Sequence, residues 1–246
     1  MTLAQWLARE PFTLSLSSGF FGFFAHCGVL MALEEHGLAP VRVTGSSAGA
    51  LIAGMYGAGL PPRGIAEVLR TLRREDFWDP FPGPGLLRGR RFREMIEHYL
   101  PARDFAECPR AVSVSAWEVF SHRTRYFTEG PLAPAIHASC CVPLLFHPVW
   151  IGRQAYVDGG IGDRPGLAGT PPGTRVLHHH LASRSPWRSR RSPALQPPRQ
   201  EGLVSLVLEG LPRSGPSRLD AGRRALGEAY EGACEALGES IGALSS

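Results

Sequence analysis

Apolar and polar residues in the first quarter of the chain alternate between a strand-like and a helix-like pattern. Residues 12–18 (FTLSLSS) form a short apolar run typical of a buried strand. Residues 23–37 then place apolar side chains at helical spacing and end at Gly37, a suitable helix terminator. Residues 41–47 repeat the strand pattern, and residues 48–60 form a helix of small apolar residues. The order strand, helix, strand, helix predicts a parallel sheet covered by helices, and therefore an α/β fold.

The middle of the chain interrupts this rhythm. Residues 72–105 are rich in Pro, Gly and aromatic side chains and contain an amphipathic helical pattern at 91–100. We interpret this segment as a lid or cap. Two extended runs, 111–120 and 124–130, then predict a hairpin, and a further strand is expected within 154–160.

The last quarter contains a segment of different composition. Residues 183–202 place five arginines (184, 188, 190, 191 and 199) among Ser and Pro with little to bury, which predicts a flexible surface loop. A strand at 203–211 and a helix at 221–238, capped by Asp220, are expected to follow. Because no linker separates two self-sufficient apolar halves, residues 1–246 are expected to form a single domain.

Charge and cysteine content restrict the possible partners. The formal charge is only +4, and every one of the 26 cationic side chains is an arginine. A surplus this small predicts no nucleic-acid partner but allows peripheral contact with an anionic membrane surface. The five cysteines are odd in number and lack metal-ligand spacing, which favours a reducing cytoplasm and predicts no metal.

Targeting signals are not evident in the sequence. The first residues lack the basic start and apolar core of a signal peptide, and the longest apolar stretch, 19–33, is short and interrupted by glycine. We therefore expect a cytoplasmic protein with no transmembrane helix, peripheral to a membrane at most.

Ser47 is the first candidate for chemistry. It lies between Gly45 and Gly49 in a G-x-S-x-G pattern, which is weak evidence in a chain with 29 glycines. Its context is stronger, because a nucleophile elbow requires a strand before the serine, a helix after it, and glycines where side chains would collide. The helix N-terminus also favours negative charge beside the serine. The alternative is an ordinary strand-to-helix turn.

A serine nucleophile needs a general base, and Asp158 is the preferred candidate. It ends an apolar strand, and a partly buried carboxylate in direct contact with the serine can accept the hydroxyl proton. The alternative is a D-G turn. His178–His180 would alternate faces of a strand, which argues against a metal site and favours a polar strand end. His147 or His178 would be the base of a histidine-dependent esterase, whereas His26 is expected to be a core histidine.

With these parts in this order, the sequence resembles the patatin-like phospholipase family, whose members are serine acyl hydrolases with a Ser–Asp dyad. The resemblance rests on a glycine-containing loop after the first strand, the G-x-S-x-G motif, a D-G-G motif at 158–160, and the similar segment 135–165 that leads through it. It implies a three-layer α/β/α sandwich with a mainly parallel sheet, and an enzyme without cofactor or metal. The residues carried over are Ser47 as nucleophile, Asp158 as general base, and the motif glycines Gly45, Gly49, Gly159 and Gly160.

One motif departs from the family pattern. The oxyanion loop of the family reads G-G-G-x-[KR]-G, whereas residues 17–22 read SSGFFG. The resemblance implies oxyanion donors at Gly19, Phe20, Phe21 and Gly22. Because serine disfavours positive φ, Ser17 and Ser18 must be extended if the loop keeps its shape. A remodelled loop would instead leave little or no catalytic activity, and the chain would then be a lipid-binding or regulatory protein.

The resemblance and the apolar residues around the motifs together predict a lipid or acyl-ester substrate. Five apolar side chains of the predicted lid would form an interfacial patch or, equally well, a small core beneath a proline-rich loop. They are Phe77, Trp78, Phe81, Leu86 and Leu87.

Overall fold

The strands of the chain form one large mixed sheet and one small sheet. The structure is a computed structural model that describes residues 1–182, 192 and 195–244. In this part of the chain the large sheet has the order β10-β9-β1-β2-β4-β8-β7, with β5 also paired to β4, and β3 pairs with β6 in the small sheet. The strands are β1 (Thr13–Leu16), β2 (Arg42–Ser46), β3 (Gly85–Leu87), β4 (Ala111–Glu118), β5 (Arg123–Phe127), β6 (Leu144–Phe146), β7 (Val149–Ile151), β8 (Gln154–Val157), β9 (Val176–His180) and β10 (Leu203–Val207).

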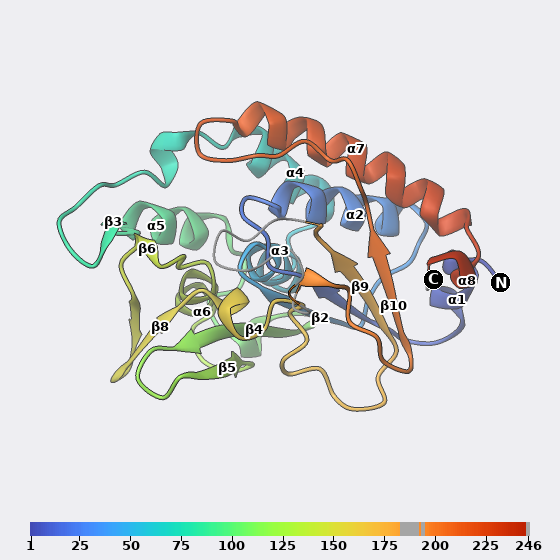
Figure 1. Cartoon of the computed structure of the whole chain (residues 1–246), viewed down its shortest axis with the longest axis horizontal. Helices are drawn as coiled ribbons and strands as arrows, with labels where there is room; N and C mark the ends of the chain where they lie inside the picture. The colour runs from blue at the N-terminus through green and yellow to red at the C-terminus, as the bar shows by residue number, and fades with distance from the viewer. Residues whose placement is uncertain (183–191, 193–194, 245–246) are drawn as a thin grey trace.

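Helices pack against the sheet and against one another. The long helix α7 runs along α2 and α4 in Figure 1 and contacts both. The α-helices are α1 (Leu3–Arg9), α2 (Phe23–Glu35), α3 (Ala48–Gly57), α4 (Pro62–Thr71), α5 (Arg90–Tyr99), α6 (Leu132–Ser139), α7 (Leu219–Gly238) and α8 (Ile241–Leu244). Short 3-10 helices lie at Arg74–Asp76, Phe105–Glu107 and Gly159–Ile161.

Strand direction divides the large sheet into two regions. The pairs β10–β9, β9–β1, β1–β2 and β2–β4 are parallel, whereas β4–β5, β4–β8 and β8–β7 are antiparallel. The predicted hairpin is thus present as β4 and β5. Because β1 and β2 are parallel with Leu16 opposite Gly45, the loops that follow them leave the same edge of the sheet. Loops at the carboxyl ends of parallel strands are the usual position of ligand sites in such folds.

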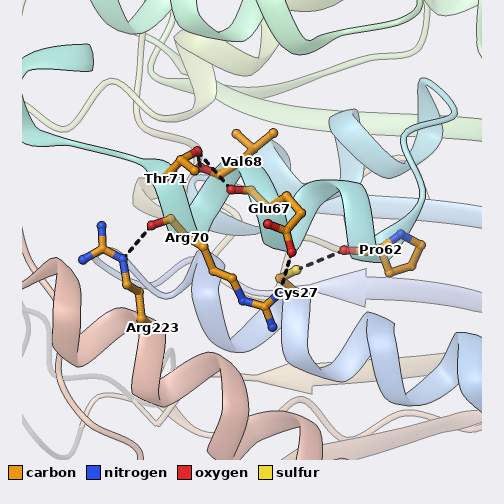
Figure 2. Close-up of polar contacts among 7 residues, drawn as sticks. All are labelled: Cys27, Pro62, Glu67, Val68, Arg70, Thr71 and Arg223. Carbon is orange, nitrogen blue, oxygen red and sulfur yellow. Dashed lines mark hydrogen bonds and ion pairs between the residues drawn. The ribbon is translucent and has the colours of Figure 1, made fainter.

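Helix α4 is fixed at its C-terminal end by a side chain from α7. Arg223 donates from Nε to the Arg70 carbonyl oxygen at 2.8 Å, as Figure 2 shows, and from Nη2 to the Leu72 carbonyl oxygen at 2.9 Å. The last carbonyl groups of a helix have no donors within the helix, and the Arg223 guanidinium provides the missing hydrogen-bond donors. Its cation also lies at the negative end of the helix dipole. The start of the predicted lid segment, 72–105, is therefore anchored to α7.

The last long helix begins earlier than the sequence pattern predicts. Asp220 was expected to cap a helix that begins at 221, but α7 begins two residues earlier, at Leu219, with Arg218 at the N-cap position, so Asp220 lies in the first turn. Most of the predicted arginine-rich loop, 183–191 and 193–194, lies outside the described residues. Arg199 is the one arginine of that loop within them.

Among the described residues, every helix is too short or too polar to cross a membrane.

Candidate active site

Ser47 lies in a sharp turn between β2 and α3. The strand ends at Ser46 and the helix begins at Ala48, as the sequence pattern predicts. Ser47 has φ 53° and ψ −119°, a region that side chains disfavour. Strained residues of this kind persist only when the surrounding structure holds them, and they gather at functional sites. The structure therefore has the strand, the sharp turn and the helix that the sequence pattern predicts around Ser47.

The two glycines of the motif allow the turn to close. A Cβ on Gly45 would come within 2.7 Å of the Ala50 nitrogen and would also collide with the Gly49 carbonyl group. A Cβ on Gly49 would collide with the carbonyl oxygen of Leu16 at the end of β1. Both glycines are therefore required by the close approach of α3 to the ends of β1 and β2.

Asp158 directly contacts the serine. Its Oδ2 accepts a hydrogen bond of 2.6 Å from Ser47 Oγ, and its Oδ1 accepts one of 2.8 Å from the Gly160 amide. The Asp158 amide donates to the Cys141 carbonyl oxygen at 2.9 Å, which fixes the backbone after β8. The structure thus brings together two residues that are 111 positions apart in the chain.

The glycines after Asp158 lie in close contact with neighbouring elements. A Cβ on Gly159 would collide with the Ser115 carbonyl oxygen of β4, and one on Gly160 would collide with the Ser18 side chain. Gly160 therefore lies beside the proposed oxyanion loop while its amide holds the carboxylate. The two glycines of the D-G-G motif therefore pack against β4 and the loop after β1.

Burial makes the Asp158 carboxyl more basic than usual. Its pKa is raised from the ordinary 3.8 to about 6, mainly because burial disfavours the charged form. The hydrogen bonds from Ser47 and Gly160 and the positive charge of Arg164 oppose this effect. A carboxylate with a pKa near 6 is still ionised at neutral pH, yet it accepts a proton far more readily than an exposed one.

Two residues at the end of α6 hold the serine turn from behind. Ser139 Oγ accepts a hydrogen bond of 2.8 Å from the Ser47 amide, and the Cys140 thiol donates to the Ser47 carbonyl oxygen at 3.1 Å. Burial raises the pKa of Cys140 well above its usual value, so the thiol stays neutral. The sequence pattern assigns no role to either residue, and no local signal does so, because their partner is about ninety positions away.

The loop after β1 keeps part of its expected geometry. Ser17 and Ser18 are not among the residues with positive φ, which agrees with the requirement that they be extended. Phe21 instead adopts the left-handed conformation, with φ 56°, which the sequence pattern did not anticipate. The Gly22 amide donates to the Gly19 carbonyl oxygen at 2.8 Å and closes the turn.

The loop residues divide between two sides. Gly19, Phe20 and Phe21 line the same pocket as Ser47, whereas Gly22 packs against Leu181 and begins α2. In the described part of the chain, no backbone hydrogen bond uses the amides of Gly19, Phe20 or Phe21. Three of the four predicted oxyanion residues are thus beside the serine, and Gly22 supports them from behind.

An apolar pocket leads away from Ser47. Its cavity volume is about 70 Å³, and its walls come from the loop after β1, α3, the end of α4, the segment 140–146 that follows α6, and the predicted lid. The lid segment contributes Leu72, Phe77, Trp78, Leu87, Phe92 and Met95. Phe77 and Leu87 are buried core residues, as the small-core interpretation predicts, whereas Phe81 and Leu86 are about half exposed. The lid and the interfacial patch stay predictions.

The histidines have partners other than the serine. His178–His180 are buried at the end of β9 rather than forming a polar strand end, because other parts of the chain cover both faces of the strand. Helix α2 covers the face of His179, and on the opposite face the Leu195 carbonyl oxygen lies 3.1 Å from His180 Nε2. The three histidines alternate as expected, with His178 Nδ1 3.3 Å from Ser15 Oγ and His179 Nδ1 2.8 Å from His26 Nδ1. Burial lowers the pKa of His178 to about 3 and that of His26 to about 4, as befits core histidines.

His147 is occupied elsewhere. Its Nε2 lies 3.0 Å from the Gly85 carbonyl oxygen and 3.2 Å from that of Phe81, next to the small sheet. Among the described residues, the Ser47 hydroxyl has a hydrogen bond to Asp158 and none to a histidine. No group of three or more His, Cys, Asp or Glu side chains in the described ranges is arranged to hold a metal ion.

Solved structures share this fold. VipD from Legionella pneumophila superposes with a TM-score of 0.65 at 15% identity, covering 93% of this chain and 67% of that one. The type III effector protein ExoU superposes with a TM-score of 0.51 at 16% identity, covering 92% of this chain and 52% of that one. These neighbours confirm the predicted α/β class with its mainly parallel sheet.

Sequence relatives and a family model agree with the fold. Two uncharacterized NTE family proteins of Mycobacterium tuberculosis are 29% and 28% identical over 154 and 163 residues, which is 61% and 65% of this chain. The matches span only 42% and 28% of those relatives. The family model described as patatin-like phospholipase matches residues 14–168. Because this match covers more than half of the sequence, the chain belongs to the patatin-like phospholipase family.

Proposed function

We propose that this chain is a serine lipid acyl hydrolase of the phospholipase A or carboxylesterase type, with Ser47 as nucleophile and Asp158 as general base. The observation that carries the proposal is the 2.6 Å hydrogen bond between Ser47 Oγ and Asp158 Oδ2 in a buried site. An activated nucleophile requires such contact with its base, and the raised pKa of the carboxyl suits proton transfer near neutral pH.

The reaction proceeds in two halves. Asp158 accepts the hydroxyl proton while Ser47 Oγ attacks the ester carbonyl carbon, and the carbonyl oxygen becomes negatively charged. Collapse of this intermediate breaks the ester bond, and the leaving alcohol takes the proton from Asp158. Water then attacks the acyl-enzyme with Asp158 again as base, which releases the acid and restores the serine.

The developing oxyanion needs donors that are not already in use. The Ser47 amide donates to Ser139, so it is unsuitable. Gly19, Phe20 and Phe21 line the pocket, and their amides take part in no backbone hydrogen bond within the described residues. Helix α3 begins directly after Ser47, and the first amides of a helix lack intrahelical partners. Backbone donors of this kind depend on the shape of the loop rather than on its side chains.

The pocket supports an acyl substrate. Its walls near Ser47 are apolar, with Leu51 and Met55 of α3 on one side and Phe77 of the lid on another. Such a lining favours an aliphatic chain over a polar group by the free energy of its transfer from water. Peripheral contact with an anionic membrane and a cytoplasmic location stay predictions.

Labelling with a fluorophosphonate probe, followed by peptide mapping, tests the proposal. The probe should attach to Ser47, and Ser47→Ala and Asp158→Asn should each lower hydrolysis of p-nitrophenyl butyrate by at least about 100-fold. His147→Ala and His178→Ala should keep activity, because neither side chain contacts the serine.

The other outcomes distinguish the alternatives. A folded chain that neither labels nor hydrolyses would indicate an inactive lipid-binding or regulatory protein. Loss of activity in a histidine variant while Asp158→Asn stays active would indicate a histidine-dependent esterase. Both outcomes would reject the dyad.

A further inference from the structure

The segment between β10 and α7 lies against the loop after β1, although the two are about 190 positions apart in the chain. Ser214 Oγ donates a 2.7 Å hydrogen bond to the Phe21 carbonyl oxygen. Pro216, two residues later, lines the pocket beside Ser47. This segment follows the region matched by the family model, residues 14–168, so the match assigns it no role.

Phe21 is the residue of the loop that most needs external support. It has φ 56°, a conformation that a phenylalanine disfavours and that persists only where neighbouring groups hold it. Its ring packs against Phe20, Phe23 and Phe77, with centroids 4.9 to 5.6 Å apart. These contacts fix the side chain, but the peptide group needs polar partners.

Both polar groups of the peptide that follows Phe21 are occupied. The Phe21 carbonyl oxygen accepts from Ser214, and the Gly22 amide donates to the Gly19 carbonyl oxygen at 2.8 Å. Because a peptide group is planar and rigid, two hydrogen bonds at its opposite ends fix its orientation. The amides of Gly19, Phe20 and Phe21, immediately before this peptide, then have little freedom to turn away from the pocket.

We propose that Ser214 is a positioning residue of the oxyanion loop: its hydroxyl holds the Phe21 carbonyl group and thereby keeps the amides of residues 19–21 directed at the reacting oxygen. This inference rests on the function proposed above. Ser214 touches no substrate and acts through the loop. Its absence should therefore weaken stabilisation of the transition state more than binding of the substrate.

Three variants test the inference through the kinetics of p-nitrophenyl butyrate hydrolysis. Ser214→Ala removes the hydroxyl, Ser214→Thr keeps it, and Ser217→Ala changes an exposed serine of the same segment. For Ser214→Ala we expect kcat and kcat/KM to fall together by roughly fivefold, the effect of one net hydrogen bond, with KM nearly unchanged. Ser214→Thr and Ser217→Ala should stay within about twofold of the wild type.

A second measurement separates loop positioning from general stability. The rate constant of fluorophosphonate labelling reports only folded molecules, and it should fall in Ser214→Ala by the same factor as kcat. In a Phe21→Gly background the left-handed turn is no longer strained, so the additional effect of Ser214→Ala should be smaller there.

The outcomes that overturn the inference are distinct from failure of the proposed function. A wild-type chain that neither labels nor hydrolyses would reject the function itself. With an active wild type, the inference is wrong if Ser214→Ala matches Ser217→Ala, if only KM changes, or if the loss is equal in the Phe21→Gly background. It is also wrong if Ser214→Ala fails to fold, because the hydroxyl would then support the whole chain rather than the loop.

Discussion

Replacing Asp158 with asparagine should stabilise the fold at alkaline pH while abolishing catalysis. Burial raises the pKa of this carboxyl from 3.8 to about 6, so the folded chain holds the proton more tightly than the unfolded chain does. The neutral form is therefore favourable in the folded state at low pH. The extra free energy of unfolding that protonated Asp158 provides is lost as the pH rises from about 4 through 6, because the carboxyl ionises at a lower pH in the unfolded chain than in the folded chain.

The magnitude follows from the size of this pKa change. Each pKa unit corresponds to about 1.4 kcal/mol, so the ionised carboxylate lowers the free energy of unfolding by about 3 kcal/mol at pH 8. Asparagine carries no charge and can keep both hydrogen bonds. Its amide oxygen accepts from the Gly160 amide, and its amide nitrogen donates to Ser47 Oγ. We expect Asp158→Asn to be more stable than the wild type by up to about 3 kcal/mol at pH 8 and by roughly half of that at pH 5.

Urea denaturation followed by tryptophan fluorescence, at pH 8 and at pH 5, measures this difference. Glu201→Gln removes an exposed carboxylate and serves as the control, with unfolding free energies close to those of the wild type at both pH values. The reasoning is refuted if Asp158→Asn is no more stable than the wild type at pH 8. It is also refuted if the gain is the same at pH 5, since the charge would then not be the cause.

Three further expectations concern the same site. The kcat/KM for a short ester should rise with pH and level off above an apparent pKa near 6, because Asp158 must be ionised to accept the proton. A midpoint near 4 would contradict the conclusion that burial raises the pKa of Asp158. Gly49→Ala should lower the free energy of unfolding by more than about 2 kcal/mol in a denaturant titration, because the new Cβ would collide with the Leu16 carbonyl oxygen. An unchanged free energy of unfolding would mean that α3 can shift to accommodate the methyl group. Phe77→Ala should favour long acyl chains, because the ring lines a pocket of only about 70 Å³. The kcat/KM for p-nitrophenyl dodecanoate, divided by that for p-nitrophenyl butyrate, should rise by roughly tenfold. An unchanged ratio would place the acyl chain elsewhere.

Local patterns predicted the backbone of the candidate site well. The strand–turn–helix around Ser47 follows from a β-branched run, two glycines and a small-residue helix, all adjacent in the chain. The position of Asp158 at a strand end follows in the same way. Both depend on short-range preferences and on the periodicity of apolar residues, which a sequence states directly.

The same patterns failed where burial depended on distant elements. The three consecutive histidines looked like a polar strand end, but distant parts of the chain, α2 and the segment at Leu195, cover the two faces of β9, so all three side chains are buried. Asp220 looked like a helix cap, but α7 begins two residues earlier than such a cap requires, at Leu219. The burial of the histidines cannot be derived from neighbouring residues, because packing against other elements decides it.

By itself the sequence determined the class of fold and the family, and it named Ser47 and Asp158 as the candidates for acyl transfer, because ordered motifs and local backbone geometry are written in neighbouring residues. Only the tertiary structure decided which groups meet. It placed Asp158 within a hydrogen bond of Ser47, put Ser139 behind the turn, and brought Ser214 to the strained peptide of Phe21. The physical reason is that such contacts join residues about 90 to 190 positions apart, and their geometry depends on how whole elements pack rather than on any local pattern.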